Sequence, residues 1–238
     1  MMRRFLHPVW LGILLLSGCS FPWNQAKTTI VEATPPALSV DNSFFESKGC
    51  FDSPDCLPES FQLIDFPIEV LEPVNESLGG LSPAVPMAMA VNNSPYFLGD
   101  DNFTYSQHCL VSRYTRYIVY ADEGYQLLDT RSKLAAFYTP VDSPLEAYSF
   151  AIAATGYRPL YNIAEDETIF YEAKVIEDSH VDESNDGYVV HLFDNFMCGC
   201  GPHYTKAIDV TVHTDGTLEI SEPLNVFRNP ALDDVCAD

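Results

Sequence analysis

The sequence predicts an α+β fold in which one helix packs on an antiparallel, disulfide-stapled sheet. Three observations predict this class: a well-capped helix at residues 144–155, strand-like segments around it, and cysteines in numbers that suit disulfides. Of the 238 residues, 47% are hydrophobic and 19% are charged, which is typical of a chain that folds around a core. A chain of this length can bury a sizeable core in one large or two small domains.

The strongest helix signal lies at residues 144–155. Ser143 and Glu146 form a capping box, and Pro144 occupies the first helical position, where its missing N–H has no cost. Gly156 stands where a left-handed residue commonly ends a helix. These residues fix both ends of the predicted helix.

A second, shorter helix is expected at residues 131–138, capped by Thr130. The clearest strand is 207–212, where apolar and polar side chains alternate, and Asp215-Gly216 predicts a hairpin turn after it. The other predicted strands are rich in aromatic and β-branched residues. They span residues 114–121, 168–176, 188–196 and 217–221.

The chain before these elements has weaker signals. Residues 19–49 show little periodicity and are predicted to be a lipid anchor and flexible tether. Residues 50–106 contain many prolines and are expected to be irregular. The predicted α+β domain therefore occupies residues 107–238.

The order of a helix followed by three strands resembles PepSY-type and cystatin-like modules. In those modules a helix with alanines and a glycine precedes a curled sheet that ends in a V-x-V-x-x-x-G-x-L hairpin. Residues 210–218 of this chain read VTVHTDGTL. The resemblance implies a binding or inhibitory module rather than a catalytic one, although a fold alone does not determine a function.

Residues 1–18 have the features of a signal peptide. Arg3 and Arg4 precede an apolar stretch that is too short for a permanent membrane span, and Leu16-Ser17-Gly18-Cys19 follows it. This tetrad resembles the lipobox of bacterial lipoproteins. The resemblance implies that Cys19 becomes the N-terminus and carries diacylglycerol and an N-acyl chain. These lipids would anchor the protein on the exported side of the cell membrane or outer membrane. The alternative is an ordinary secretory signal with an incidental cysteine.

The charge balance argues against nucleic acid as a partner. The chain has 34 acidic and 12 basic side chains, for a formal net charge of −22. Removal of residues 1–18 takes away Arg3 and Arg4, so the mature chain has 10 basic side chains against 34 acidic ones, or −24. Phosphate binding needs clustered lysine and arginine, which this balance does not supply.

The six cysteines other than Cys19 are candidates for three disulfides, as expected for an exported protein. Cys50 and Cys56 flank a turn-like pentapeptide and are predicted to pair locally. Cys198 and Cys200 are separated by one glycine and are not expected to pair with each other. Two arrangements remain, in which Cys109 takes one member of that pair and Cys236 takes the other.

Two classes of function are consistent with these residues. The first is an envelope-anchored binding or interaction module with an unknown ligand or partner protein, no catalytic residues and no cofactor besides the lipid on Cys19. The alternative is a metal-binding, redox or enzymatic envelope protein centred on Cys198, Cys200 and His203, because two thiolates and an imidazole are suitable ligands for soft metals. Motifs for common nucleophiles and nucleotide cofactors are absent from the sequence, which favours the first class.

Two further hypotheses name specific residues for a site, one of histidines and one of apolar side chains. His191, His203 and His213 lie on or beside predicted strands, so they could converge on one site. Several apolar side chains near Cys198 and Cys200 would form an interaction patch if they were exposed together. They are Phe193, Phe196, Met197 and Tyr204.

Overall fold

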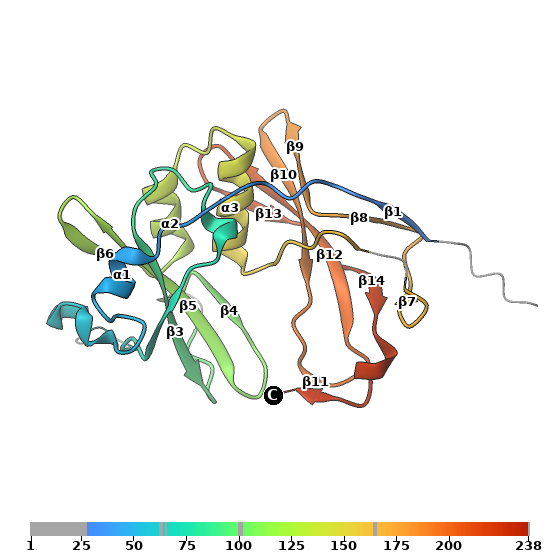
Figure 1. The fold of residues 1–238 in the computed structure, drawn as a ribbon, viewed down its shortest axis with the longest axis horizontal. Coiled ribbons are helices and arrows are strands. Elements are labelled where there is room, and N and C mark those ends of the chain that lie inside the picture. Colours follow the sequence, from blue (N-terminus) through green and yellow to red (C-terminus); the bar gives the residue numbers. More distant parts are fainter. Residues whose placement is uncertain (1–27, 62–63, 65, 100–101, 164–165, 238) are drawn as a thin grey trace, which may run out of the picture.

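Two antiparallel sheets and the helices between them form the molecule, and this confirms the predicted α+β class. The computed structural model describes residues 28–237 apart from 62–63, 65, 100–101 and 164–165. Cys19 lies outside the described residues. The two sheets diverge from helices α2 and α3 like the sides of a wedge (Figure 1). The predicted strands therefore divide between two sheets instead of forming one.

The first sheet has five strands in the order β2-β3-β5-β4, and β6 also pairs with β5. Its strands are β2 (Val70–Pro73), β3 (Met87–Ser94), β4 (Tyr105–Gln107), β5 (Ser112–Ala121) and β6 (Gly124–Leu128). β3 pairs with β5 along eight residue pairs, from Met87 opposite Val119 to Ser94 opposite Ser112. Residues 50–106 are therefore not a separate irregular segment, and the predicted boundary at residue 107 falls inside the first sheet.

The second sheet has the order β7-β14-β12-β10-β9, with β13 paired to β12. Its strands are β7 (Phe170–Tyr171), β9 (His180–Ser184), β10 (Gly187–Asp194), β12 (Tyr204–His213), β13 (Leu218–Ile220) and β14 (Leu224–Arg228). The prediction of a single strand at 168–176 is wrong. This segment is interrupted between β7 and β8 (Val175–Glu177), and the two pieces pair with different neighbours.

Helix α3 (Pro144–Thr155) has the predicted bounds and lies between the sheets. The Ser143 hydroxyl accepts a hydrogen bond from the Glu146 N–H at 3.3 Å, and Gly156 ends the helix with φ of 72°. A side chain on Gly156 would collide with the ring of Tyr105 in β4. Helix α2 (Arg131–Tyr138) is also confirmed, with the Thr130 hydroxyl accepting from the Lys133 N–H.

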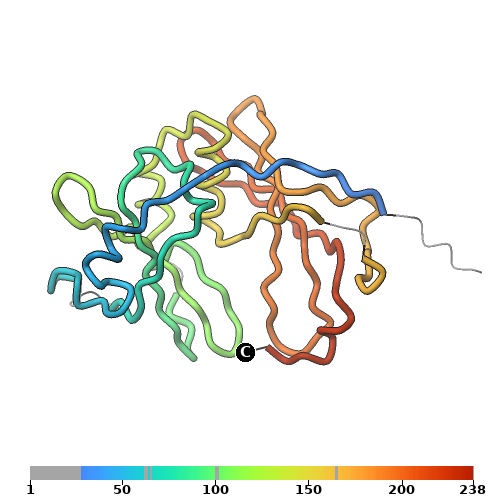
Figure 2. Tube along the Cα trace, viewed as in Figure 1, coloured from blue at the N-terminus to red at the C-terminus, as the bar shows by residue number. Residues whose placement is uncertain are grey.

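The segment of residues 28–42, here called the N-terminal strap, crosses from the second sheet to the first. It begins as β1 (Thr29–Val31), which pairs with β8 in parallel, and leads into α1 (Ser43–Ser47). Figure 2 shows this segment in blue, running across the molecule. Phe45 of α1 is fully buried. The predicted flexible tether is therefore wrong for residues 28–49, because strand pairing and apolar burial hold this part against the fold.

Asp178 fixes the strap to the second sheet. Its side chain is fully buried, and its carboxylate accepts hydrogen bonds from the N–H groups of Ala33, Asn162 and Ile163 at 3.3, 2.9 and 3.3 Å. A buried carboxylate needs such donors because burial removes its water. The Asp178 side chain therefore links its own segment to the strap and to residues 162–163.

Shorter elements complete the described chain. β11 (Gly199–Cys200) pairs with β15 (Cys236–Ala237) at the far end of the second sheet. Short 3-10 helices occur at Pro54–Cys56, Glu59–Phe61, Glu76–Leu78 and Pro230–Leu232. Within the described part of the chain, no helix combines the length and apolar character needed to cross a bilayer.

Candidate functional site: the cleft between the sheets and its apolar rim

The six cysteines form three disulfides. Cys50 bonds to Cys56, as predicted, and the structure selects Cys109–Cys198 and Cys200–Cys236 from the two arrangements that the sequence leaves open. Cys200 and Cys236 are direct partners in the β11–β15 pair. Cys109 lies in the β4–β5 turn, so its bond to Cys198 joins the first sheet to the second. Such disulfides are typical of chains that fold outside the reducing cytoplasm.

The predicted metal residues do not meet as ligands. Cys198 and Cys200 are bonded to different cysteines and carry no thiolate, and His203 Nε2 lies 2.9 Å from the carbonyl oxygen of Val235. Among the described residues, no three histidine, cysteine, aspartate or glutamate side chains surround a common point. In this structure residues 198–203 are instead held by the two disulfides of Cys198 and Cys200.

The predicted convergence of three histidines is wrong. His191 Nδ1 lies 2.6 Å from Asp209 Oδ1 in the neighbouring strand, while His213 Nε2 lies 3.4 Å from Glu219 Oε1. His191 stacks instead on His180, with 5.2 Å between ring centroids, because these residues are opposite each other in β10 and β9. Pairing register decides which strand histidines meet, and the spacing in the sequence does not reveal that register.

A cleft of about 660 Å³ lies between the two sheets. It is lined by β4, the N-terminal end of α2, the segment after α3 and the end of β10. A smaller cavity of about 240 Å³ adjoins it and shares Gln107, Asp194 and Phe196. The two cavities are therefore neighbours, and residues of both sheets line each of them.

The cleft contains charged and polar side chains from both sheets. Arg131 Nε donates to the carbonyl oxygens of Ala154 at 3.0 Å and Thr104 at 3.3 Å, and these bonds fix the guanidinium at the wall. Burial raises the pKa of Tyr157; the Asp194 carboxylate raises it further, while Arg131 opposes the shift. The wall thus presents a cation, a carboxylate and a neutral phenol, which can orient a polar group of a bound molecule.

Six exposed large apolar side chains belong to three segments near the Cys109–Cys198 disulfide: residues 96–97, which reach His108 through Phe97, residues 110–111 after Cys109, and residues 196–197 before Cys198. We call them the apolar rim: Tyr96 (75% exposed), Phe97 (68%), Leu110 (69%), Val111 (43%), Phe196 (38%) and Met197 (40%). The Phe97 ring contacts His108, with 5.2 Å between centroids, and His108 precedes Cys109. Clustered exposure of this kind marks interaction sites, whereas single exposed apolar residues are ordinary.

The rim contains only part of the predicted patch. Phe196 and Met197 are exposed, but Phe193 is 1% exposed and belongs to the core, and Tyr204 is half-buried. Sequence reasoning missed the residues from the first sheet. The available signal was the pair Tyr96-Phe97, since consecutive apolar residues are unusual in a turn after Asn, Ser and Pro.

No family model, curated protein or solved structure matches this chain. The resemblances to bacterial lipoproteins and to PepSY-type and cystatin-like modules remain predictions. The cleft and its rim are the features of this structure that point to a function.

Proposed function

We propose that the protein is a lipid-anchored binding module of the bacterial cell envelope, and that its apolar rim docks a partner protein. The observation that carries this proposal is the group of six exposed apolar side chains around Cys109–Cys198. The disulfide supports the proposal because it holds turns of both sheets in one place, which lowers the entropy lost on binding. Aromatic side chains held in this way are typical anchors of protein interfaces.

Charge defines the partner's chemistry. The chain carries a formal charge of −22, so a partner with apolar side chains surrounded by lysine and arginine complements it best. The cleft beside the rim adds Arg131 and Asp194, which can orient polar groups of that partner. We expect association to slow as salt concentration rises, because salt screens the attraction between opposite charges.

The proposed anchor is Cys19, with the lipids that the lipobox implies. Only eight residues, Ser20 to Lys27, separate Cys19 from Thr28, where the described fold begins. Nine chain steps span at most roughly 30 Å. The domain would thus be held near the membrane surface, and its partner would be found there too.

Site-specific photo-crosslinking tests the docking surface. A photoreactive amino acid is placed at Leu110 in the rim, and at Leu224 as a matched control that is 60% exposed in β14 of the second sheet. In the native host, we expect one defined adduct from Leu110 and none from Leu224. Phe97→Ser should reduce the Leu110 adduct about ten-fold, since losing an aromatic anchor commonly costs more than 1 kcal/mol of binding.

Equal crosslinking from the two positions, or a Leu110 adduct that Phe97→Ser leaves unchanged, would argue against a docking rim. The anchor is tested separately by metabolic labelling with an alkyne analogue of palmitate. Label is expected on the wild-type chain and not on Cys19→Ala. A labelled Cys19→Ala chain would disprove the assigned lipid site without affecting the docking result.

A further inference from the structure

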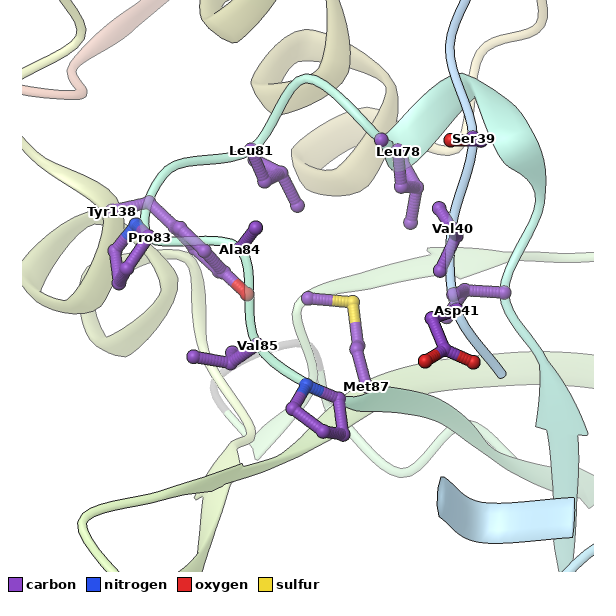
Figure 3. A pocket seen from close by; sticks show the side chains of 13 residues that line it. Ser39, Val40, Asp41, Leu78, Leu81, Pro83, Ala84, Val85, Met87 and Tyr138 are labelled. Atoms are coloured by element: carbon purple, nitrogen blue, oxygen red, sulfur yellow. The ribbon is translucent and has the colours of Figure 1, made fainter. Parts of the chain in front are cut away.

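A separate cavity of about 200 Å³ lies between the N-terminal strap and the start of β3. Its floor is apolar and deeply buried: Val74, Leu78, Leu81 and Met87 are 5, 6, 7 and 3% exposed. Its mouth contains Asp41 and Ala84, which are exposed. Figure 3 shows Leu78, Leu81, Met87, Asp41 and Ala84 around a common space. The cavity is distinct from the cleft between the sheets and shares none of its lining residues.

The walls of this cavity are fixed before any ligand enters. The Asn42 side chain donates to the Val74 carbonyl oxygen and accepts from the Val74 N–H, both at 3.2 Å. These two bonds attach the strap to the segment that forms the floor. Gly79 lies so close to the Ser39 backbone that a Cβ there would collide with the Ser39 carbonyl oxygen. A preformed cavity binds ligands without the cost of opening it.

Tyr138 supplies the polar group of the cavity. Its side chain comes from the last turn of α2 and is 4% exposed. Figure 3 shows this hydroxyl directed toward the space between the lining side chains. Burial raises the pKa of Tyr138, so the phenol keeps its proton and remains a donor. The hydroxyl can therefore donate a hydrogen bond to the oxygen of a ligand that enters the cavity.

Asp41 sets the charge at the mouth. Its carboxylate accepts a hydrogen bond from the Ser43 N–H at 2.8 Å, and bonds from Ser43 lower its pKa. The carboxylate is therefore ionised at neutral pH, and it disfavours ligands that carry a carboxylate of their own. Among apolar molecules with an oxygen acceptor, the cavity should thus prefer uncharged ones.

We propose that this cavity binds a small uncharged, mainly apolar molecule whose acceptor oxygen takes a hydrogen bond from Tyr138. Medium-chain ketones, esters and alcohols have this chemistry. An engineered apolar cavity of roughly 150 Å³ holds benzene, so a cavity slightly larger suits a short chain with one polar group. The binding site is independent of the proposed docking rim.

The test uses three probes with eight carbons: octan-2-one, octane and octanoate. The exported chain begins at Ser20 behind a cleavable secretory signal, so that no attached lipid competes, and binding is followed by ligand-observed NMR. We expect octan-2-one to bind best. Tyr138→Phe should weaken octan-2-one about five-fold, which is the effect of one hydrogen bond, and leave octane unchanged.

Ala84→Phe provides a second variant, because it places a ring at the exposed mouth and leaves the core intact. It should abolish binding of both octan-2-one and octane while the circular dichroism spectrum stays that of the parent chain. The proposal is overturned if octan-2-one does not bind the parent chain, if octanoate binds as tightly, or if either variant binds octan-2-one like the parent.

Discussion

Apolar side chains of other elements pack against both faces of the first sheet, whereas they pack mainly against one face of the second. In β5, Tyr117 and Val119 pack in the core cluster that contains α3, and Ile118 between them packs in a second cluster with Phe45 of α1. In β12, Ile208, Val210 and Val212 face α3. The side chains between them, Asp209, Thr211 and His213, lie on the more exposed face.

This difference determines which strands a sequence pattern reveals. A strand covered on one face alternates apolar and polar residues, and β12 shows that pattern. A strand covered on both faces has no such alternation. β3 reads MAMAVNNS and consists of small or apolar residues in its first half, so its strand character is hidden. Comparison of the two sheets thus explains why the second was predicted more fully than the first.

The largest predicted effect comes from removing the bond that joins the two sheets. The double variant Cys109→Ala with Cys198→Ala opens a loop whose ends are 89 residues apart. Loop-closure entropy gives about 4.6 kcal/mol of lost unfolding free energy for such a loop. Urea denaturation followed by circular dichroism measures this loss. We also expect the two sheets to unfold less cooperatively, since their covalent link is gone.

The matched control is Cys50→Ala with Cys56→Ala, whose ends are 6 residues apart and lie within the covering of the first sheet. The same arithmetic gives about 2.4 kcal/mol for this pair. An equal loss from the two double variants would contradict the view that the inter-sheet bond is the main covalent constraint.

The next prediction compares alanine substitutions on the outer faces of the two sheets. Ile118→Ala removes a fully buried side chain from the second face of β5 and should cost about 3 kcal/mol of unfolding free energy. Thr211→Ala changes the exposed face of β12 and should cost less than about 1 kcal/mol. Thermal and urea denaturation measure both. Similar costs would mean that the outer face of β12 is also a packed interface.

The smallest effect concerns alkaline pH. Burial raises the pKa of Tyr117 well above its ordinary value of 10.0. As pH rises, the Tyr117 hydroxyl ionises in the unfolded chain before it ionises in the folded one. Its contribution to the free energy of unfolding is therefore complete below about pH 10 and declines as pH rises toward the folded-state pKa. Tyr117→Phe should reduce the decline between pH 9 and 11 by about 1.4 kcal/mol in total. Urea denaturation between pH 9 and 11 at about half-unit steps measures the slope. An unchanged slope would show that Tyr117 ionises in the folded chain.

Local signals predicted the elements whose ends depend on neighbouring residues. Ser143, Glu146 and Gly156 fix α3, and Asp215-Gly216 forms the turn between β12 and β13, as expected. The local Cys50–Cys56 bridge was predicted for the same reason. Features that depend on distant contacts were missed. The strap and α1 are examples, since the strap pairs with three residues of β8 and Phe45 of α1 needs an apolar pocket.

Arg116 shows most clearly what the sequence cannot reveal. It lies in a segment correctly predicted as a strand, yet its side chain is 1% exposed. Its guanidinium donates to the Phe66 carbonyl oxygen and to Asn92, and it lies over the Phe103 ring. Burial lowers the pKa of Arg116 to about 10. The apolar rim is similar, because the Cys109–Cys198 bond joins chain segments that are 89 residues apart.

The parallel pairing of β1 with β8 has a mechanical consequence. A pull on the chain ahead of Thr28 acts along the axis of β1, so its hydrogen bonds to β8 are loaded together in shear instead of opening one at a time. The bond from Ala33 to Asp178 lies next along the same line of force. The strap thus resists tension where the fold begins, and the cavity wall beyond it is shielded from that load.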